Sequence, residues 1–275
     1  MNNFKKIGMT ALAASLVSTS VFAGEVTVAG GASMTVDGYS TTGERNAGKG
    51  FSMGNQLTFT GGGELDNGLT VGISFVLDQG DEGTTGAATS PFDSHSVSIS
   101  SDALGTITMH GEGGSSAQAA IDTTAAGDIW DEFDGATTGT TVSSSTSGSD
   151  ILVYTLPSMV DGLAISASYS PQQTALSSST AYALTYTGVE GLSVSYGVGE
   201  ATVTAVTNTD VDSTTMKASY AYGPITVAYS NNDYATEVAN KDQETTSYKV
   251  SYTVSDGLSV SYGTEEIALE NDNQD

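Results

Sequence analysis

The stretch Gly191-Leu192-Ser193-Val194-Ser195-Tyr196-Gly197 returns letter for letter at Gly257-Leu258-Ser259-Val260-Ser261-Tyr262-Gly263. Apolar residues alternate with small polar ones in both copies, and this period of two is typical of a β-strand with one apolar face. Looser copies begin at Gly68, Gly162 and Gly223, and the later copies recur about every 30 residues. A stretch of about 30 residues is long enough for one hairpin and its loops. The sequence therefore predicts an all-β protein built from a repeated hairpin, as in a barrel, a propeller or a solenoid.

About thirteen strand-like segments follow this rhythm. We expect them at residues 25–37, 51–62, 69–78, 94–101, 106–112, 150–156, 163–170, 180–187, 192–199, 215–222, 225–230, 245–254 and 258–263. The connections alternate between short and long, and the short ones carry turn dipeptides such as Asn67-Gly68, Gly223-Pro224 and Asp256-Gly257. This alternation places the tight turns at one end of the strands and the long loops at the other. It favours a transmembrane up-and-down antiparallel β-barrel over a Greek-key sandwich.

The N-terminus has the pattern of a secretory signal peptide. Lys5 and Lys6 precede an apolar stretch at residues 7–17, and Val21-Phe22-Ala23 offers small residues for cleavage. We expect residues 1–23 to be removed and residues 24–275 to form one barrel domain. The apolar run is too short to span a membrane as a helix, and no later segment is long enough, so a helical membrane protein is excluded.

The chain is strongly acidic, since 7 lysines and arginines against 32 aspartates and glutamates give a formal net charge of -25. Removal of Lys5 and Lys6 makes the mature chain more acidic still. Such a surface repels phosphate, so we expect no nucleic-acid partner. The acidity fits either simple solvation of an exported protein or a path that favours cations. The chain has no cysteine, which excludes thiol catalysis and cysteine–metal sites.

The two faces of the predicted strands differ in chemistry. Leu163, Ile165 and Tyr169 fall on one side of their strand, and serines and alanines fall on the other. Tyrosine suits a lipid interface. Small hydroxyl side chains that face inward in a wide barrel cannot fill it, so water does. The alternative is a secreted or surface-anchored β-rich adhesin or structural protein, whose apolar face would point inward. Alternation alone fits both, and the turn rhythm, the tyrosines and the signal peptide together favour the barrel.

Several stretches resemble the general porins of Gram-negative outer membranes, especially the α-proteobacterial kind. They are Gly24-Glu25-Val26-Thr27-Val28-Ala29-Gly30, Leu104-Gly105-Thr106-Ile107-Thr108-Met109-His110-Gly111, and Tyr154-Thr155-Leu156-Pro157 followed by Asp161-Gly162-Leu163. The resemblance covers the whole chain. It implies a sixteen-stranded barrel in outer-membrane lipid, usually a homotrimer, through which small hydrophilic solutes diffuse passively. Family members end in a strand with a terminal Phe, whereas this sequence ends in a loop after an odd number of strands. We therefore expect about three C-terminal strands to be missing.

The longest connection, residues 113–149, follows the fifth predicted strand, where the resemblance implies a third loop that folds inward and narrows the pore. It contains five acidic residues around Trp130, namely Asp122, Asp128, Asp131, Glu132 and Asp134. Its Gly, Ser and Thr content also fits an ordinary mobile extracellular loop, but its position favours the constriction. Carboxylates crowded in a water-filled neck attract cations, so we expect a pore that prefers cations.

The lumen wall is expected to carry four charged or titratable side chains. By alternation, these are His110, Glu112, Lys217 and Lys249. They are either functional or scattered lumen charges with no special role. The one arginine of the chain, Arg45, lies in the first long loop, so no arginine cluster opposes the third loop. We expect a weak transverse field.

Neither a cofactor nor a catalytic site is expected. Asp78, Asp81, Glu82 and Asp93 bracket the second loop, but nothing matches a defined calcium loop. Calcium bound loosely between loops is a weak alternative. His95 and His110 stand in different predicted strands, and no nucleophile elbow, zinc motif or phosphate loop appears. We therefore expect a protein that is not an enzyme.

Overall fold

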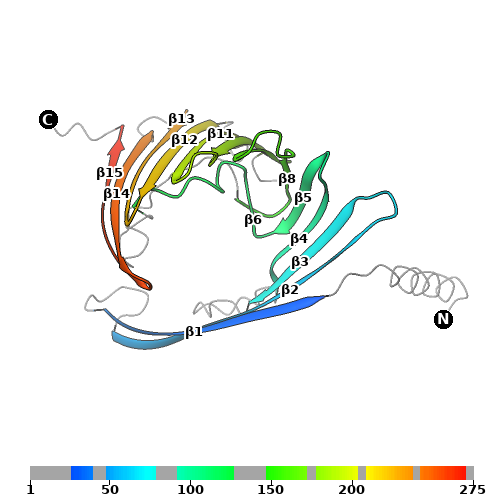
Figure 1. Ribbon diagram of the computed structural model, residues 1–275, viewed down its shortest axis with the longest axis horizontal. Helices are drawn as coiled ribbons and strands as arrows, with labels where there is room; N and C mark the ends of the chain where they lie inside the picture. The colour runs from blue at the N-terminus through cyan, green and yellow to red at the C-terminus, as the bar shows by residue number, and fades with distance from the viewer. Residues whose placement is uncertain are drawn as a thin grey trace, which may run out of the picture.

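The computed structural model describes residues 26–39, 48–78, 92–126, 147–171, 178–203, 209–237 and 242–270. Every regular element in these ranges is a β-strand. Thirteen of the strands form one antiparallel sheet that curves round a common axis (Figure 1). Within the same ranges, no helix has the length and apolar character needed to cross a membrane.

The large sheet follows the chain order, with β8 next to β5. Its strands are β1 (Thr27–Tyr39), β2 (Gly48–Glu64), β3 (Thr70–Asp78), β4 (Phe92–Ser101), β5 (Gly105–Glu112), β8 (Ile151–Thr155), β9 (Leu163–Ser170), β10 (Ser178–Tyr186), β11 (Leu192–Val203), β12 (Thr209–Tyr222), β13 (Ile225–Thr236), β14 (Gln243–Ser255) and β15 (Leu258–Leu269). A separate hairpin pairs β6 (Gly114–Ser115) with β7 (Ser147–Gly148).

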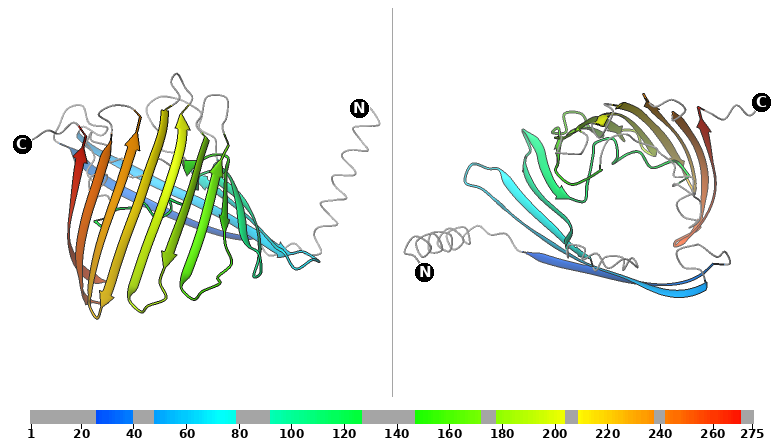
Figure 2. Two further views of the ribbon diagram at one scale, coloured as in Figure 1. Left: turned by 90° about the horizontal axis from the view of Figure 1, so that it is seen from above. Right: turned by 180° about the vertical axis from the view of Figure 1, so that it is seen from behind.

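The predicted strands are present in the predicted order, and the tight turns gather at one end of the sheet (Figure 2). Several strands extend farther at the opposite end than predicted. β12 begins at Thr209 instead of residue 215, and β13 continues to Thr236 instead of ending at residue 230. The ladder needs only backbone groups, so it continues where the apolar alternation has stopped.

The tight turns explain the glycine that opens each copy of the repeated motif. Gly191 has a φ of 76°, and a Cβ at this position would lie 2.3 Å from the carbonyl oxygen of Ala221 on the adjacent strand. Both the left-handed backbone and the close approach require glycine. The Ala221 N–H donates a hydrogen bond of 2.8 Å to the Gly191 carbonyl. The turn is thereby tied to the strand beside it.

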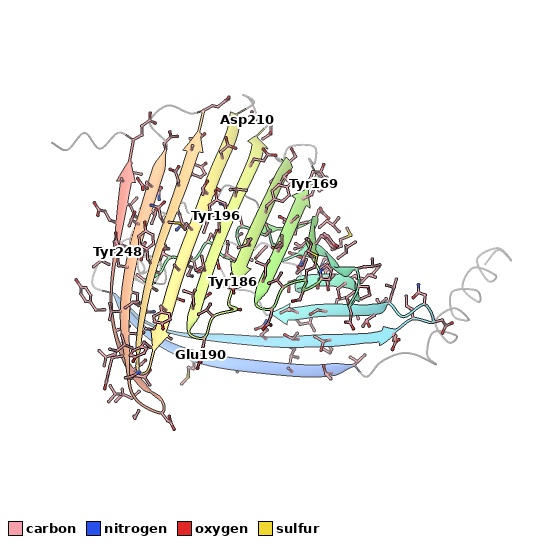
Figure 3. All side chains as sticks on the ribbon, turned by 45° about the horizontal axis from the view of Figure 1, so that its top comes forward. Tyr169, Tyr186, Glu190, Tyr196, Asp210 and Tyr248 are labelled. Carbon is pink, nitrogen blue, oxygen red and sulfur yellow. The ribbon has the colours of Figure 1, made fainter. Side chains whose placement is uncertain are left out.

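Burial is inverted relative to a water-soluble protein. Tyr196 and Tyr248, on the outer side of the sheet, are 48% and 55% exposed (Figure 3). Many of the most buried side chains are small, polar and inward-facing, and Thr215, Ser230 and Ser247 are all 0% exposed. A secreted sandwich would bury its apolar set between two layers. The outward position of these side chains does not favour the adhesin alternative and supports a barrel whose apolar surface faces lipid.

β1 and β15 are the edges of the described sheet, since each is paired with one neighbour. The sixteen-strand total stays a prediction. Residues 1–23, the expected signal peptide, lie outside the described residues.

Candidate functional site

After β5 the chain turns to the inner side of the curved sheet, where residues 116–126 run across the strands (Figure 1). We call residues 116–126 the inward segment. Gly113 has a φ of 69°. A Cβ on Gly114 would lie 2.4 Å from Cγ2 of Ile151 and 2.6 Å from Cβ of His110. The two glycines therefore permit the sharp turn and the close passage along the wall.

The inward segment begins with one short turn. The Oγ of Ser116 accepts the N–H of Ala119 at 3.0 Å, and the Ser116 carbonyl accepts the N–H of Ala120 at 3.0 Å. A serine that bonds the backbone three residues later is a common start for such a turn. Small alanine side chains keep the turn thin, and Ala117 is 2% exposed against the wall. Ala117, Ala181 and Ala183, with Ile121 packed against them, form a small apolar cluster.

Serine hydroxyls of the wall hold the backbone of the inward segment. Three backbone N–H groups donate to serine Oγ atoms, namely Ala117 to Ser168 of β9 at 2.9 Å, Ala125 to Ser230 of β13 at 2.8 Å, and Ala126 to Ser247 of β14 at 2.8 Å. Buried N–H groups require such partners. We call these three serines the wall serines.

The side chain of Gln118 forms a further link. Its Nε2 donates to Oγ1 of Thr215 at 3.3 Å, and its Oε1 accepts from Oγ of Ser213 at 2.8 Å. Both partners lie on β12, and all three residues are buried. The amide therefore satisfies two buried hydroxyls at once.

Two charged residues bind the C-terminal half of the inward segment. The Nζ of Lys217 donates to Oγ1 of Thr123 at 3.1 Å, and Oγ1 of Thr124 donates to Oε2 of Glu265 at 2.5 Å. The sheet registers place Lys217 beside Ser230, Ser230 beside Ser247, and Ser247 beside Glu265. These anchors therefore form one row across four adjacent strands.

The structure describes one of the five acidic residues predicted for the constriction. Asp122 lies in the inward segment and is half-buried. Asp128, Asp131, Glu132 and Asp134 lie outside the described residues, and so does Trp130. Their contribution to a constriction stays a prediction.

The four predicted wall residues occupy two parts of the sheet. His110 and Glu112 alternate with the exposed Ile107 and Met109 of β5. Lys217 and Lys249 lie on the inner face of β12 and β14, in step with the buried Thr215 and Ser247. Lys217 contacts the inward segment directly. His110 and Glu112 on β5 are therefore far from Lys217 and Lys249 in the order of the strands in the sheet.

Sequence reasoning did not identify Gln118, Glu265 or the wall serines. A signal for Glu265 was present, because continuing the alternation from Ser261 and Gly263 places it inward. Gln118 gives no such signal, because its partners lie 95 and 97 residues farther along the chain.

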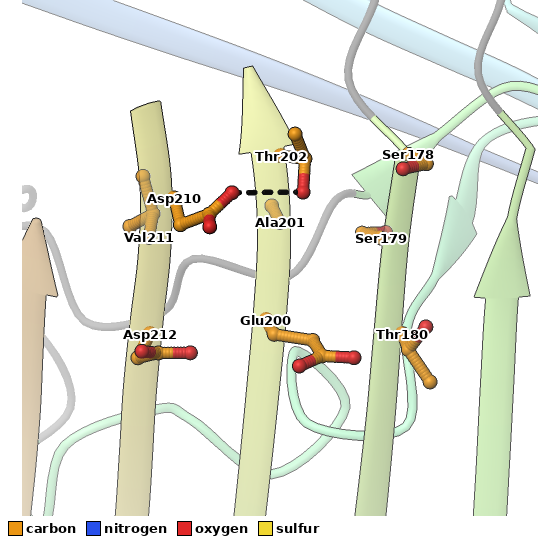
Figure 4. Close-up of a pocket in the computed structure, with 9 residues that line it drawn as sticks. All are labelled: Ser178, Ser179, Thr180, Glu200, Ala201, Thr202, Asp210, Val211 and Asp212. Carbon is orange, nitrogen blue, oxygen red and sulfur yellow. Dashed lines mark hydrogen bonds between the residues drawn. The ribbon is translucent and has the colours of Figure 1, made fainter. Parts of the chain in front are cut away.

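An acidic hollow of about 260 Å³ lies at the long-loop end of β10, β11 and β12 (Figure 4). Glu200 and Asp212 are ladder partners, and both are exposed in alternation with buried inward residues. The Oγ1 of Thr202 donates to Oδ1 of Asp210 at 3.0 Å. The carboxylates stand on the outward face, so they do not contribute to the inner wall.

Among the described residues, no three His, Cys, Asp or Glu side chains are placed to hold a metal ion. The loop considered for calcium, residues 79–91, lies outside the described residues, and Asp81 and Glu82 lie within it. Calcium bound between loops stays untested.

Comparison with known proteins places this geometry in context. The family model described as Gram-negative porin matches residues 8–275, and no curated protein matches the sequence. The in-vitro folded OmpT of Vibrio cholerae, in its trimer form, is 14% identical with a TM-score of 0.62, and the match covers 90% of this chain and 78% of that chain. OmpF of Salmonella typhi in complex with daunomycin is 16% identical with a TM-score of 0.62, covering 88% and 79%.

A third similar structure is an anion-selective porin from Comamonas acidovorans. It is 17% identical with a TM-score of 0.55, and the match covers 88% of this chain and 79% of that chain. At identities this low, the three likenesses show a shared fold and no more.

Proposed function

The chain belongs to the Gram-negative porin family and lies in the outer membrane, and we propose that it forms a water-filled channel for passive diffusion of small hydrophilic solutes. The observation that carries this proposal is the inverted burial. Apolar and tyrosine side chains point outward, and serines, threonines and glycines point inward. A lumen walled by hydroxyl groups is hydrated.

We further propose that residues 113–149 form the constriction. The inward segment supports this, since it crosses the inner wall from Ser168 on β9 to Glu265 on β15. Backbone and side-chain bonds hold it in place, and it takes up space inside the curve of the sheet. A constriction of this kind sets which solutes pass.

The net charge of the chain supports a preference for cations. Asp122 and Glu265 accompany the inward segment, and the chain as a whole carries a formal charge of -25. Lys217 and Lys249 match Asp122 and Glu265 in number, so the support comes from the acidity of the chain as a whole. An anion-selective porin shares the fold, so the fold does not fix the sign of the selectivity. The lumen charges fix it.

Currents through planar bilayers test both statements. The purified protein should produce discrete single-channel steps, and its reversal potential in a tenfold KCl gradient should have the sign of potassium permeation. The absence of current steps would contradict the channel. A reversal potential of the opposite sign would contradict cation preference while leaving the channel intact. Because exposed charges are screened, the preference should weaken as the salt concentration rises.

We also propose a homotrimer in the membrane. A similar structure, OmpT of Vibrio cholerae, was determined in a trimer form. The broad apolar outer surface leaves room for contacts between barrels. Light scattering in detergent, corrected for bound detergent, measures the protein mass directly. A mass of one chain would contradict the trimer.

Passive diffusion needs no cofactor and no catalytic residue, and we propose none. We propose that residues 1–23 are removed on export. Mass spectrometry of the N-terminal peptide of the membrane-inserted protein should give Gly24 as the first residue.

A further inference from the structure

The glycine that closes the repeated motif has a different environment from the one that opens it. Gly197 and Gly263 end the two identical copies, and both lie beneath the inward segment. A Cβ on Gly197 would lie 2.9 Å from Cδ1 of Ile121 and 3.3 Å from Cγ of Gln118. A Cβ on Gly263 would lie 3.0 Å from Cβ of Ala126. The wall therefore lacks a side chain at two places where the segment passes close to it.

These glycines belong to a regular series. β9, β11, β13 and β15 run in the same direction, and in each one the third inward residue after the tight turn contacts the inward segment. In order, these residues are Ser168, Gly197, Ser230 and Gly263. The two serines accept backbone N–H groups, and the two glycines let the segment approach the sheet. Serines that hold the segment by a hydrogen bond therefore alternate along its path with glycines that leave room for it.

We propose that Gly197 and Gly263 are seats that fix how far the inward segment stands from the wall, and thereby set the width of the channel. This inference rests on the proposed channel function. A sheet held by its full ladder of hydrogen bonds does not yield to an added side chain. The segment is bonded to the wall on both sides of Gly197, at Ala117 and at Thr123, and beside Gly263 at Ala126. Added bulk beneath it should therefore move it toward the middle of the lumen.

Position 197 is the one to test, because its nearest neighbour is the end of the Ile121 side chain, which a second substitution can shorten. That end can turn aside for a single methyl group, so the effect should be small for alanine and grow with larger side chains. Single-channel conductance should fall progressively through Gly197→Ala, Gly197→Val and Gly197→Leu, since each added group displaces Ile121 farther. The matched control is Gly31→Leu, which adds the same bulk to the inner face of β1. A Cβ there meets nothing within 4 Å. Its conductance should stay close to that of the unmodified protein.

A second variant separates seating from loss of structure. Ile121→Val removes Cδ1, the atom nearest to the added Cβ. Combined with Gly197→Ala, it should return the conductance to that of the Ile121→Val single variant. The comparison of the double variant with the Ile121→Val single variant tests the proposal even if Gly197→Leu fails to assemble.

Two results would overturn the proposal. One is a Gly197 series whose conductance matches that of Gly31→Leu, and the other is a Gly197→Ala loss that Ile121→Val does not relieve. A failure of the unmodified protein to conduct would instead contradict the channel function, so the two failures are distinguishable.

Discussion

The inner wall has two regions built from the same kinds of residue but buried to different degrees. On β4 and β5, Ser96, Ser98 and Thr108 are half-buried. On β12, β13 and β14, the hydroxyl side chains beneath the inward segment are fully buried. We call these regions the open wall and the covered wall. The comparison teaches that an inward hydroxyl either faces the lumen or holds a segment of chain, and that residue type does not say which.

Removing the wall serines should have the largest effect, because it should make the covered wall resemble the open wall. A Ser168→Ala, Ser230→Ala and Ser247→Ala triple variant leaves two buried N–H groups and one partly buried N–H group without acceptors, and each buried one costs about 1–3 kcal/mol. We expect the inward segment to leave the covered wall. Liposome swelling with sugars of increasing size should then show a larger exclusion limit.

The matched control replaces three serines of the open wall, Ser94, Ser96 and Ser98, with alanine. These residues alternate on the inner face of β4, away from the anchors of the inward segment. Their loss should leave the exclusion limit unchanged. Equal effects of the two triple variants would show that the wall serines do not hold the segment.

The buried amide of Gln118, which lies against the covered wall, should give the next largest effect. Gln118→Leu removes the hydrogen bonds of its amide to Ser213 and Thr215, and each hydrogen bond lost at a buried hydroxyl costs about 1–3 kcal/mol. Adding Ser213→Ala and Thr215→Val should recover most of this loss, because replacing both partners of a hydrogen bond is nearly neutral. The temperature at which the folded band converts to the unfolded band in detergent gels measures the change. No recovery in the combined variant would rule out the hydrogen-bond explanation.

Lys217 should have a smaller effect on stability and a clearer one on selectivity. Lys217→Gln removes a positive charge that contacts Thr123 and costs less than about 1 kcal/mol, because the side chain is partly exposed. The reversal potential should shift toward stronger cation preference, since a positive charge leaves the constriction. Lys249→Gln removes the same charge and provides the comparison. A larger shift for Lys249→Gln would place the narrowest point nearer to β14.

The smallest effect is expected on the outward face. Glu200→Gln relieves a like-charge pair with its ladder partner Asp212, so stability should rise by about 0.2–1 kcal/mol. Conductance and reversal potential should not change, because the pair faces away from the lumen. A change in either would show that the outward carboxylates influence the pore.

Local pattern predicted most of the fold. The period of two located the strands and placed Tyr169 on the apolar face. The turn rhythm, the tyrosines and the signal peptide together predicted that this face points outward, and Tyr169 is exposed there. It missed the polar strand ends, such as residues 209–214, where pairing continues without an apolar face. Of the candidate site, alternation gave the face of Lys217. It could not give the partners of Gln118, since nothing in a single sequence links residues so far apart.

The anchors of the inward segment all come later in the chain than the segment itself. Ser168 follows Ala117 by 51 residues, and Glu265 follows Thr124 by 141 residues. Contacts between such distant residues form slowly, because a long stretch of chain must be ordered first. We therefore expect the inward segment to take its place on the wall only after the strands that anchor it, up to β15, have joined the sheet.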